Sequence, residues 1–409
     1  MFSTQYRAVP INLAADAIRV LCLQKGEFLD QDIQCKLIEV YLAGPESFPY
    51  KALSYHWGSD AMSHSISINS CRARVTTNLY MALRYLREEG RDIYLWVDAL
   101  CIDQANHMEK SHQIRQMQLI YKNAEEVLIW LGLGCPGIYR LIDSSNKLKE
   151  QLELNVQNWR SISEPWELET MKRSFRLIRT YSLEMDGLRE LLGRPWFRRV
   201  WILQEVVSAR HATVICGGKS ISGTIFAILP FLMDVKCDDY TQAVLDIMPG
   251  PARETSWWGD ERTLKMLLRK FRTSKATMSQ DKIYALLGIS SDAGDGITFP
   301  IDYELSPEEV IQNAISFLLL GRVIPDSNLM FPQWTFDQLL QSLDQLASNR
   351  NYKALSVCLQ ELEVNPNEVD VNYTTPLKLG VINGHREVAR LLARRGAAIE
   401  IKRNIPGGQ

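Results

Sequence analysis

The sequence has few features that would support a metal site or a disulfide framework. Its eight cysteines occur singly, with no C-x-x-C pair, and none of its six histidines is placed to complete a metal site with them. His107 and His112 are five residues apart, a spacing that does not bring two rings to one face of a helix. The sequence therefore predicts reduced thiols and no structural or catalytic metal.

Long apolar runs and an excess of one charge are also absent. Apolar stretches such as 226–233 and 314–321 fall far short of the roughly 20 residues that a membrane-spanning helix requires, and the N-terminal segment lacks the pattern of a secretory signal. The 46 Lys and Arg residues nearly balance the 48 Asp and Glu residues, so no global field favours nucleic acid or an anionic membrane. We therefore expect a cytoplasmic protein that neither spans a membrane nor binds nucleic acid.

Hydrophobic patterning predicts an α/β architecture in the first half of the chain. Between about residues 50 and 216, short β-type runs alternate with longer helical patterns, the first helix capped by Asn78 and the second by Asn106. Such strands are most simply joined by right-handed crossovers into a parallel sheet, which binds ligands beyond the carboxyl ends of its strands. The predicted strands are 51–55, 93–97, 127–131 and 212–216.

Three regions are predicted along the 409 residues. Residues 1–216 form the α/β domain, residues 217–332 a mostly helical extension, and residues 333–409 a stretch of degenerate ankyrin-like repeats. In the last region, segment 374–404 follows the ankyrin pattern of T-P-L, a short helix, G-H, a second helix and a G-A turn. Because about three stacked repeats are needed for stability, we expect this tail to dock on the rest of the chain or on a protein partner.

Three blocks rich in tryptophan and polar residues lie at predicted strand and helix ends. They are 52–58 (ALSYHWG), 95–104 (LWVDALCIDQ) and 194–205 (RPWFRRVWILQE). The first two blocks follow the first two predicted strands, where parallel sheets bind ligands. The three blocks are therefore the candidate source of a binding site.

The third block is predicted to lie on one continuous helix that ends at about residue 208. At 100° per residue, Glu205 lies about 180° from Trp196 and points away from the core. Trp201 lies one turn before Glu205, and Arg198 lies about two turns before Glu205. An indole, a guanidinium and a carboxylate are therefore predicted to share a ridge that ordinary packing does not explain. The opposite, sheet-facing stripe is predicted to consist of Trp196, Val200, Leu203 and Val207.

Taken together, the three blocks resemble the heterokaryon incompatibility (HET) domain family of filamentous fungi. The family pattern reads Y-x-A-L-S-Y-x-W-G, then L-W-h-D-A-x-C-I-x-Q with h hydrophobic, and later R-x-W-x-x-R-x-W-x-x-Q-E; segments 120–124 (IYKNA) and 129–132 (IWLG) also match it. The resemblance covers roughly residues 5 to 310. It implies an effector of programmed cell death in non-self recognition, with a fold related to Toll/interleukin-1 receptor (TIR) domains, a flavodoxin-like parallel sheet flanked by helices.

The resemblance also implies a candidate chemistry. TIR domains that cleave NAD+ carry W-C-x-x-E on the corresponding helix; Trp201 and Glu205 have the same separation, with Ile202 in place of the cysteine. Ordinary glycoside hydrolysis uses two carboxylates, but nicotinamide leaves as a neutral molecule, so one carboxylate that stabilises an oxocarbenium-like centre suffices. Glu205 is thus the candidate catalytic residue, with NAD+ as candidate substrate and no further cofactor.

Several alternatives remain open from the sequence. The tryptophans can belong to the core, Asp98 can cap the next turn, Cys101 can be a buried inert thiol, and Glu205 can be a solvated surface acid. The whole protein can instead be a self-associating adaptor that recruits a partner through its ankyrin-like tail, or a sensor that binds a nucleotide without cleaving it. Because related TIR enzymes commonly need oligomerisation, we expect a homo-oligomer. The candidate substrate-binding residues are Tyr55, Trp57, Gly58, Asp98, Cys101, Arg198 and Trp201.

Overall fold

The computed structural model divides the chain into two compact units. The first comprises Met1–Gly296 with Pro300–Glu304, and the second comprises Ile297–Phe299 with Leu305–Gln409. The structure describes residues 3–26, 32–42, 48–58, 61–155, 165–178, 181–250, 253, 256–260, 262–294, 298–320, 323, 335–340 and 393. The predicted ankyrin-like segment 374–404 thus lies outside the described residues, apart from residue 393.

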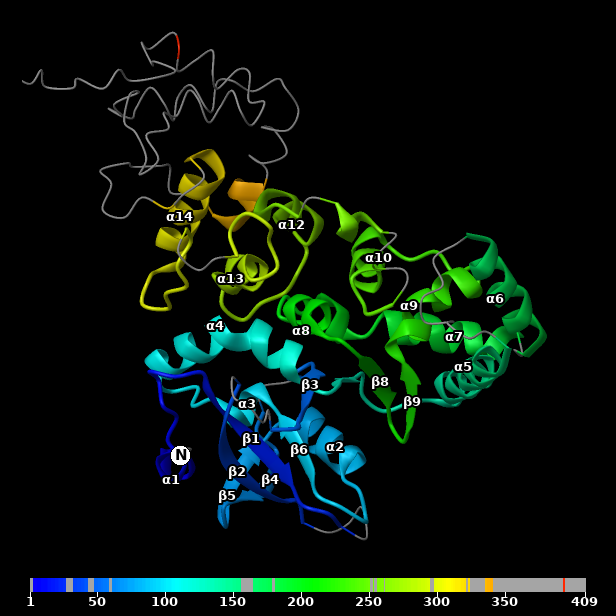
Figure 1. Ribbon diagram of the computed structural model, residues 1–409, viewed down its shortest axis with the longest axis horizontal. Helices are drawn as coiled ribbons and strands as arrows, with labels where there is room; N and C mark the ends of the chain where they lie inside the picture. The colour runs from blue at the N-terminus through cyan, green and yellow to red at the C-terminus, as the bar shows by residue number, and fades with distance from the viewer. Residues whose placement is uncertain are drawn as a thin grey trace, which may run out of the picture. The chain divides into compact units, whose positions relative to one another are not determined.

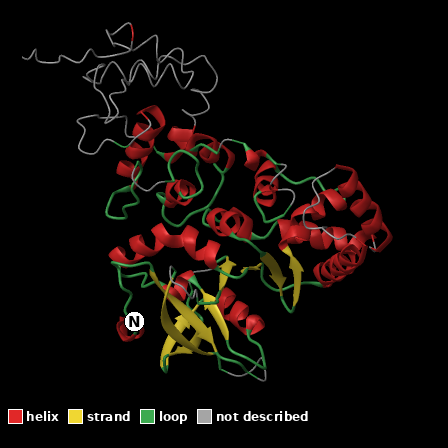
Figure 2. Ribbon diagram, viewed as in Figure 1, coloured by secondary structure: helices red, strands yellow, loops and turns green. Residues whose placement is uncertain are grey.

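A mixed β-sheet forms the centre of the first unit (Figures 1 and 2). Among the described residues it has nine strands in the order β5-β4-β2-β1-β6-β3-β7-β8-β9. Their bounds are β1 Ala17–Leu23, β2 Gln34–Tyr41, β3 Lys51–Tyr55, β4 His64–Ile68, β5 Cys71–Val75, β6 Ile93–Trp96, β7 Val127–Trp130, β8 Ala212–Cys216 and β9 Lys219–Ser222.

The four strands that the sequence predicts form the parallel part of this sheet. β3 pairs in parallel with β6 and with β7, and β7 pairs in parallel with β8. From one side to the other, these four strands therefore run in the order second, first, third and fourth along the chain. The prediction of an α/β fold with a parallel sheet is confirmed for this part of the chain.

The remaining strands make the sheet mixed, which the prediction of a purely parallel sheet missed. β1 is antiparallel to both β2 and β6, while β4 with β5 and β8 with β9 form antiparallel pairs. β2 shows the alternation of exposed and buried residues expected of a strand with one solvated face. The turn between β4 and β5 uses Asn69 and Ser70, both with positive φ, as a tight hairpin requires.

Helices cover the sheet and extend beyond it in the first unit. Crossover helix α2 lies on one face, and α4 and α8 pack against each other on the opposite face, as right-handed crossovers require when the chain reverses direction across the sheet (Figure 1). The described helices are α1 Ser3–Ala8, α2 Thr77–Leu86, α3 Asp98–Cys101, α4 His107–Asn123, α5 Pro136–Asn155, α6 Pro165–Ile178, α7 Tyr181–Leu192, α8 Ile202–Ser208, α9 Gly223–Leu232, α10 Asp239–Asp246, α12 Leu264–Lys270 and α13 Asp281–Leu287, with α14 Pro307–Leu320 in the second unit.

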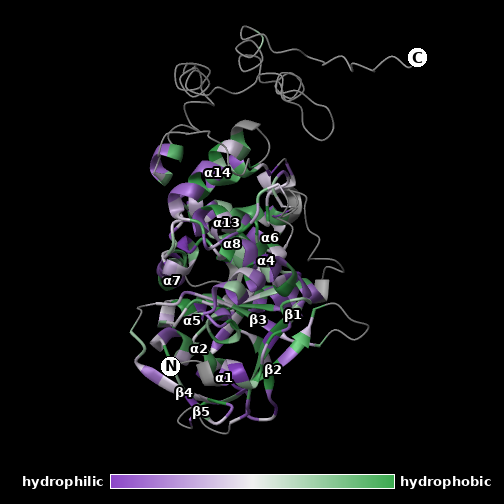
Figure 3. Cartoon of the chain, turned by 90° about the vertical axis from the view of Figure 1, so that its left-hand side faces the viewer, coloured by the Kyte–Doolittle hydropathy of each residue, from purple (hydrophilic) through white to green (hydrophobic). Residues whose placement is uncertain are grey.

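The core of the first unit lies along the central strands. Every residue of β1 and β7 is buried, and hydrophobic residues gather along the strands in Figure 3. Burial of apolar surface on both faces is the dominant favourable contribution to folding of such a sheet. None of the helices in the described part of the chain has the length and apolarity needed to cross a bilayer.

Two helix starts differ in how well the sequence predicts them. Asn106 caps α4, as predicted, because its side chain accepts a hydrogen bond from the backbone of Glu109. The cap of α2 is Thr76, whose hydroxyl accepts from the backbone of Leu79, so Asn78 lies inside the helix. The carboxamide of Asn78 is thereby free to make tertiary contacts, described below.

The prediction of one continuous helix over the third block is wrong. A short 3-10 helix, η2 (Pro195–Arg198), comes first. Arg199 then forms an isolated parallel β-bridge with Lys275, and α8 begins only at Ile202. The backbone N–H of Val200 donates to the Lys275 carbonyl at 3.0 Å, and Lys275 donates back to the Arg198 carbonyl at 2.6 Å. This break changes the helical phase, so Glu205 faces the interior and is 0% exposed.

Candidate functional site

A buried cluster of one arginine and two carboxylates lies at the carboxyl ends of β3 and β6. One guanidinium nitrogen of Arg199, Nη2, donates to Asp98 Oδ2 at 2.7 Å. The other, Nη1, donates to Glu205 Oε1 at 3.1 Å and to the main-chain carbonyl of Tyr55 at 2.8 Å. The arginine therefore joins the end of β3, the residue that follows β6 and helix α8.

The first sequence block closes this cluster through a tryptophan. The indole Nε1 of Trp57 donates to the same Asp98 Oδ2 at 3.0 Å, and the Arg199 guanidinium lies 5.9 Å from the ring centroid of Trp57. The other oxygen of Asp98 accepts from the backbone N–H of Ala99 at 2.7 Å. Asp98 is thus held by an arginine, an indole and a backbone amide, which are the partners that a buried carboxylate requires.

Glu205 is less completely satisfied than Asp98. Its Oε1 accepts from Arg199, whereas Oε2 has no hydrogen-bond partner of good geometry among the described residues. Burial raises the pKa of Glu205 to about 7. The positive charge of Arg199 opposes this rise, the negative charge of Asp98 adds to it, and a hydrogen bond with the Ser54 hydroxyl opposes it. A carboxyl group whose pKa lies near neutral pH is suited to exchange a proton.

Arg199 itself keeps its charge in this buried position. Burial acts to lower the pKa of Arg199, but the charges of Glu205 and Asp98 outweigh it and leave that pKa above its ordinary value. Burial lowers the pKa of the neighbouring His56, and the positive charge of the same guanidinium lowers it further. The cluster is therefore organised around one permanent positive charge.

The sequence-based choice of arginine falls one residue away from this centre. Arg198 pairs with Asp238 at 3.1 Å and stacks over the ring of Tyr240 at 4.6 Å, outside the cluster. The signal that would have found the correct residue is in the family pattern, where the second arginine of R-x-W-x-x-R corresponds to Arg199. The prediction relied on helical spacing, and the break before α8 removes that spacing.

Trp201 and Glu205 lie one helical turn apart, because the backbone N–H of Glu205 donates to the Trp201 carbonyl at 3.3 Å, but their side chains have different partners. Trp201 precedes the first residue of α8, and its side chain is a hydrogen-bond partner of Asp281, whose pKa it lowers against the larger raising effect of burial. The Tyr303 hydroxyl donates to the same Asp281 at 2.6 Å. The side chain of Trp201 therefore contacts Asp281, whereas Glu205 belongs to the arginine-carboxylate cluster.

Cys101 lies near the cluster but belongs to the core. It is fully buried, its Sγ accepts from the backbone N–H of Val97 at 3.4 Å, and burial raises the pKa of its thiol to about 12. Such a thiol is protonated at neutral pH and unreactive. The open alternative of an inert buried cysteine is thus the one that fits this geometry.

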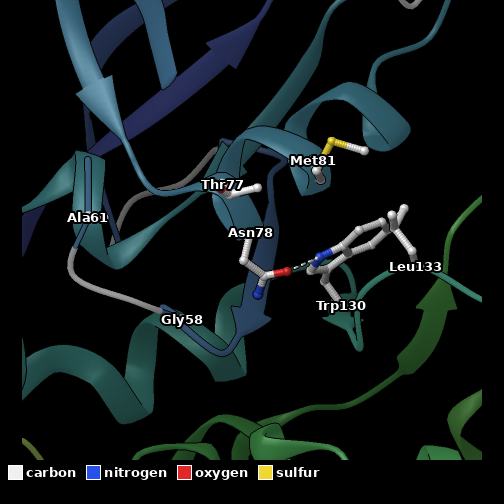
Figure 4. A pocket seen from close by; sticks show the side chains of 7 residues that line it. All are labelled: Gly58, Ala61, Thr77, Asn78, Met81, Trp130 and Leu133. Atoms are coloured by element: carbon white, nitrogen blue, oxygen red, sulfur yellow. Dashed lines mark hydrogen bonds between the residues drawn. The ribbon is translucent and has the colours of Figure 1, made fainter. Parts of the chain in front are cut away.

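A separate pocket lies between α2 and the carboxyl ends of β3 and β7 (Figure 4). Its volume is about 260 Å³, and Gly58 is the one candidate site residue among those that line it. Glu205 is not one of its lining residues. The lining residues are Gly58, Ala61, Thr77, Asn78, Met81, Trp130 and Leu133.

The described residues hold neither a cluster suited to a metal ion nor a disulfide. Within them, no group of three or more His, Cys, Asp or Glu side chains is arranged to hold a metal ion. Their seven cysteines are free thiols. The arginine-carboxylate cluster and the pocket near it are the two candidate sites.

The strand order and the cluster define an α/β protein whose candidate site is assembled from strand ends and one short helix. Residues 50–205 match the family model described as Heterokaryon incompatibility protein (HET). The chain is also 27% identical over 351 residues to the Neurospora crassa protein "Heterokaryon incompatibility protein 6, OR allele", in an alignment that covers 74% of this chain and 51% of that relative. The chain is therefore similar to the HET family over this segment.

The chain spans about half the length of the curated relative that it matches. The search of solved structures found no match. The family match covers all three sequence blocks up to Glu205, so it includes every residue of the arginine-carboxylate cluster.

Proposed function

We propose that this chain acts in heterokaryon incompatibility, as an effector of regulated cell death in non-self recognition. The observation that carries the proposal is that all three sequence blocks of the HET match contribute to one buried cluster. The first block supplies Tyr55 and Trp57, the second supplies Asp98, and the third supplies Arg199 and Glu205. A motif whose separated parts converge on one site is typical of a functional centre.

For the fold, we propose a TIR-like relationship. The four parallel strands lie in the order second, first, third and fourth, which is the beginning of the flavodoxin-like order 2-1-3-4-5. Ligands of such sheets bind at the carboxyl ends of the strands, where both the cluster and the pocket lie. We also propose that the protein works as a homo-oligomer and that its ankyrin-like tail binds a protein partner.

For the chemistry, we propose hydrolysis of NAD+ at its nicotinamide glycosidic bond, with Glu205 as the catalytic carboxylate. The C–N bond breaks, its electron pair leaves with neutral nicotinamide, and a water molecule adds to the ribose carbon. The proton that this water loses passes to the carboxylate and then to solvent. A pKa of Glu205 near 7 suits this step at neutral pH.

The burial of Glu205 sets a condition on this chemistry. The carboxylate is 0% exposed and is covered by Arg199, so a ribose reaches it only after the arginine moves. We propose that assembly of the protein triggers that movement. Trp57 and Gly58 lie in the turn after β3. Both are more exposed to solvent than Tyr55, the last residue of that strand.

The same burial favours a second candidate function, the non-enzymatic adaptor. If Arg199 never releases Glu205, the cluster serves to hold three distant chain segments together, and the surface of the assembled domain recruits partners. In that case the chain would cause cell death without consuming NAD+. The two candidates therefore differ in whether the Glu205 carboxylate itself is needed.

The test compares two buried glutamates. The wild-type chain, Glu205→Gln and Glu184→Gln are expressed in fungal hyphae and also purified, and viability and nicotinamide release from NAD+ are measured, the latter with and without a crowding agent. Glu184 is a matched control, because it is 1% exposed, accepts from the Ser144 hydroxyl and lies on α7 outside the cluster. An enzyme requires that Glu205→Gln abolishes cell death and lowers nicotinamide release by about 100-fold or more, while Glu184→Gln retains both.

The other outcomes discriminate equally well. Cell death that persists in Glu205→Gln, with no nicotinamide released by an assembled wild-type sample, identifies the adaptor and rejects the hydrolase. Normal growth of hyphae that express the folded wild-type chain, together with any compatible or incompatible partner strain, rejects the role in incompatibility itself.

A further inference from the structure

We infer that the pocket between α2 and the loop after β7 binds a planar heteroaromatic ring of the size of a nucleobase. The inference rests on its place in the sheet, its size and the chemistry of its walls. It does not depend on NAD+ hydrolysis, because neither Glu205 nor Arg199 lines this pocket.

The pocket lies at the point where the strand order of the parallel sheet reverses. From β3 the chain crosses to β6 on one side, and from β6 it returns across β3 to β7 on the other. The two crossover helices then cover opposite faces, which leaves a crevice between the carboxyl ends of β3 and β7. Gly58 after β3 and Leu133 after β7 both line the pocket, so it occupies that crevice (Figure 4).

The size of the pocket selects a single ring system. Its volume of about 260 Å³ is slightly below the roughly 300–1,000 Å³ typical of pockets for drug-sized ligands. A complete dinucleotide does not fit such a space, whereas one mono- or bicyclic ring does. We therefore assign the pocket to a base and place the rest of any nucleoside at its mouth.

The walls favour a flat, neutral and polarisable group. Met81, Trp130 and Leu133 supply a thioether, an indole and an aliphatic side chain, and Figure 4 shows Met81 and Leu133 beside the Trp130 ring. Sulfur and aromatic groups contact ring systems favourably. None of the seven lining residues is charged, so the pocket does not select phosphate. Its two polar side chains, Thr77 and Asn78, already have hydrogen-bond partners within the protein, so the recognition is by shape and apolar contact.

The walls are held in place before any ligand binds. The carboxamide of Asn78 accepts from the Trp130 indole N–H at 2.9 Å and donates to the His56 carbonyl, so it joins α2, β7 and the turn after β3. The rings of Tyr85 and Trp130 lie 5.6 Å apart, and this contact also restrains the indole. A pre-organised pocket binds without a large ordering cost.

A glycine at position 58 forms the turn that borders the pocket. Gly58 has a φ of 83°, a conformation that side chains with a Cβ atom rarely adopt, and its backbone N–H donates to His56 Nδ1 at 3.0 Å. The preceding residue, Trp57, turns to Asp98 in the arginine-carboxylate cluster. The turn therefore separates the pocket from the cluster while contributing to both.

The experiment measures nucleoside binding to the full-length protein. Adenosine, guanosine, cytidine and uridine are titrated separately by ligand-detected NMR and calorimetry, with D-ribose as the control for sugar binding. We expect saturable binding of at least one nucleoside and none of ribose. Leu133→Arg and Ala61→Trp, on two exposed parts of the lining, are expected to weaken that binding by about tenfold or more, because they remove apolar contact or fill the space.

A matched variant controls for changes of surface charge. Leu183 on α7 is 37% exposed, close to the 48% of Leu133, but does not line the pocket, so Leu183→Arg is expected to bind as the wild type does. The proposal is overturned if no nucleoside binds, or if folded Leu133→Arg and Ala61→Trp both bind as tightly as Leu183→Arg. Nucleosides contain no nicotinamide bond, so loss of the hydrolase proposal would leave this result unaffected.

Discussion

Arg19 and Arg199 are both buried and both pair with buried carboxylates, but they satisfy those carboxylates to different extents. Arg19 makes a two-point contact with Glu109, at 2.6 and 3.1 Å, and the backbone N–H of Asp103 donates to the same carboxylate at 2.7 Å. Arg199 is instead shared between Asp98 and Glu205, so its guanidinium makes a one-point contact with each carboxylate.

This difference separates a structural tie from a candidate active centre. The remaining nitrogen of Arg19, Nε, donates to the Val9 carbonyl, and Nη1 also donates to the Cys101 carbonyl. The pair therefore joins β1, α4 and the N-terminal segment, and both of its charges are satisfied. Glu205 differs from Glu109 in two further ways: it lies where the three sequence blocks converge, and burial raises its pKa to about 7. A buried carboxyl with these properties is a candidate functional group.

The largest effect is expected from removal of the shared arginine. Arg199→Met leaves two buried carboxylates without a cation, and breaking a buried ion pair in this way costs about 3–5 kcal/mol of unfolding free energy. The measurement is equilibrium unfolding in urea. Arg198→Met is the control, because its salt bridge with Asp238 is exposed and contributes about 1 kcal/mol or less. Equal losses in the two variants would show that Arg199 does not organise the cluster.

The parallel strands and four members of the cluster were predictable from the sequence, because local patterns encode them. Strand ends place Tyr55, Trp57 and Asp98 together, and the family motif brings Glu205 to the same centre. The edge strands were missed because pairs such as β4 with β5 are short and polar on one face. Their position depends on partners rather than on their own hydrophobicity.

The errors in the third block, 194–205, share one cause, a contact far away in sequence. Lys275 pairs with the backbone around Arg199 and interrupts the predicted helix before α8. That interruption moves Arg199 into the cluster, sends Trp201 toward Asp281 and turns Glu205 inward. Helical periodicity carries no information on such a long-range backbone contact, so the face on which Glu205 lies was predicted wrongly.

A smaller effect distinguishes the two glutamates directly. Glu109→Gln removes the anion that completes Arg19 and is expected to cost about 3 kcal/mol of unfolding free energy. Glu205→Gln is expected to change stability by about 1 kcal/mol or less, because Arg199 keeps Asp98 and a neutral amide is less costly to bury than a carboxylate. Urea unfolding of both variants tests this. A loss in Glu205→Gln as large as that in Glu109→Gln would make both pairs structural.

The smallest expected effect is a change in the pH dependence of stability. Burial raises the pKa of Glu205 from 4.5 to about 7, so between these values the folded state binds more protons than the unfolded state, and this group makes stability fall as pH rises. The lowered pKa of His56 acts in the opposite direction, but it is present in both proteins compared. Between about pH 5 and pH 8, the melting temperature of the wild type should therefore fall relative to that of Glu205→Gln. A difference between the two proteins that stays constant over this range would mean that Glu205 remains ionised in the folded state, fully compensated by Arg199 as Glu109 is by Arg19.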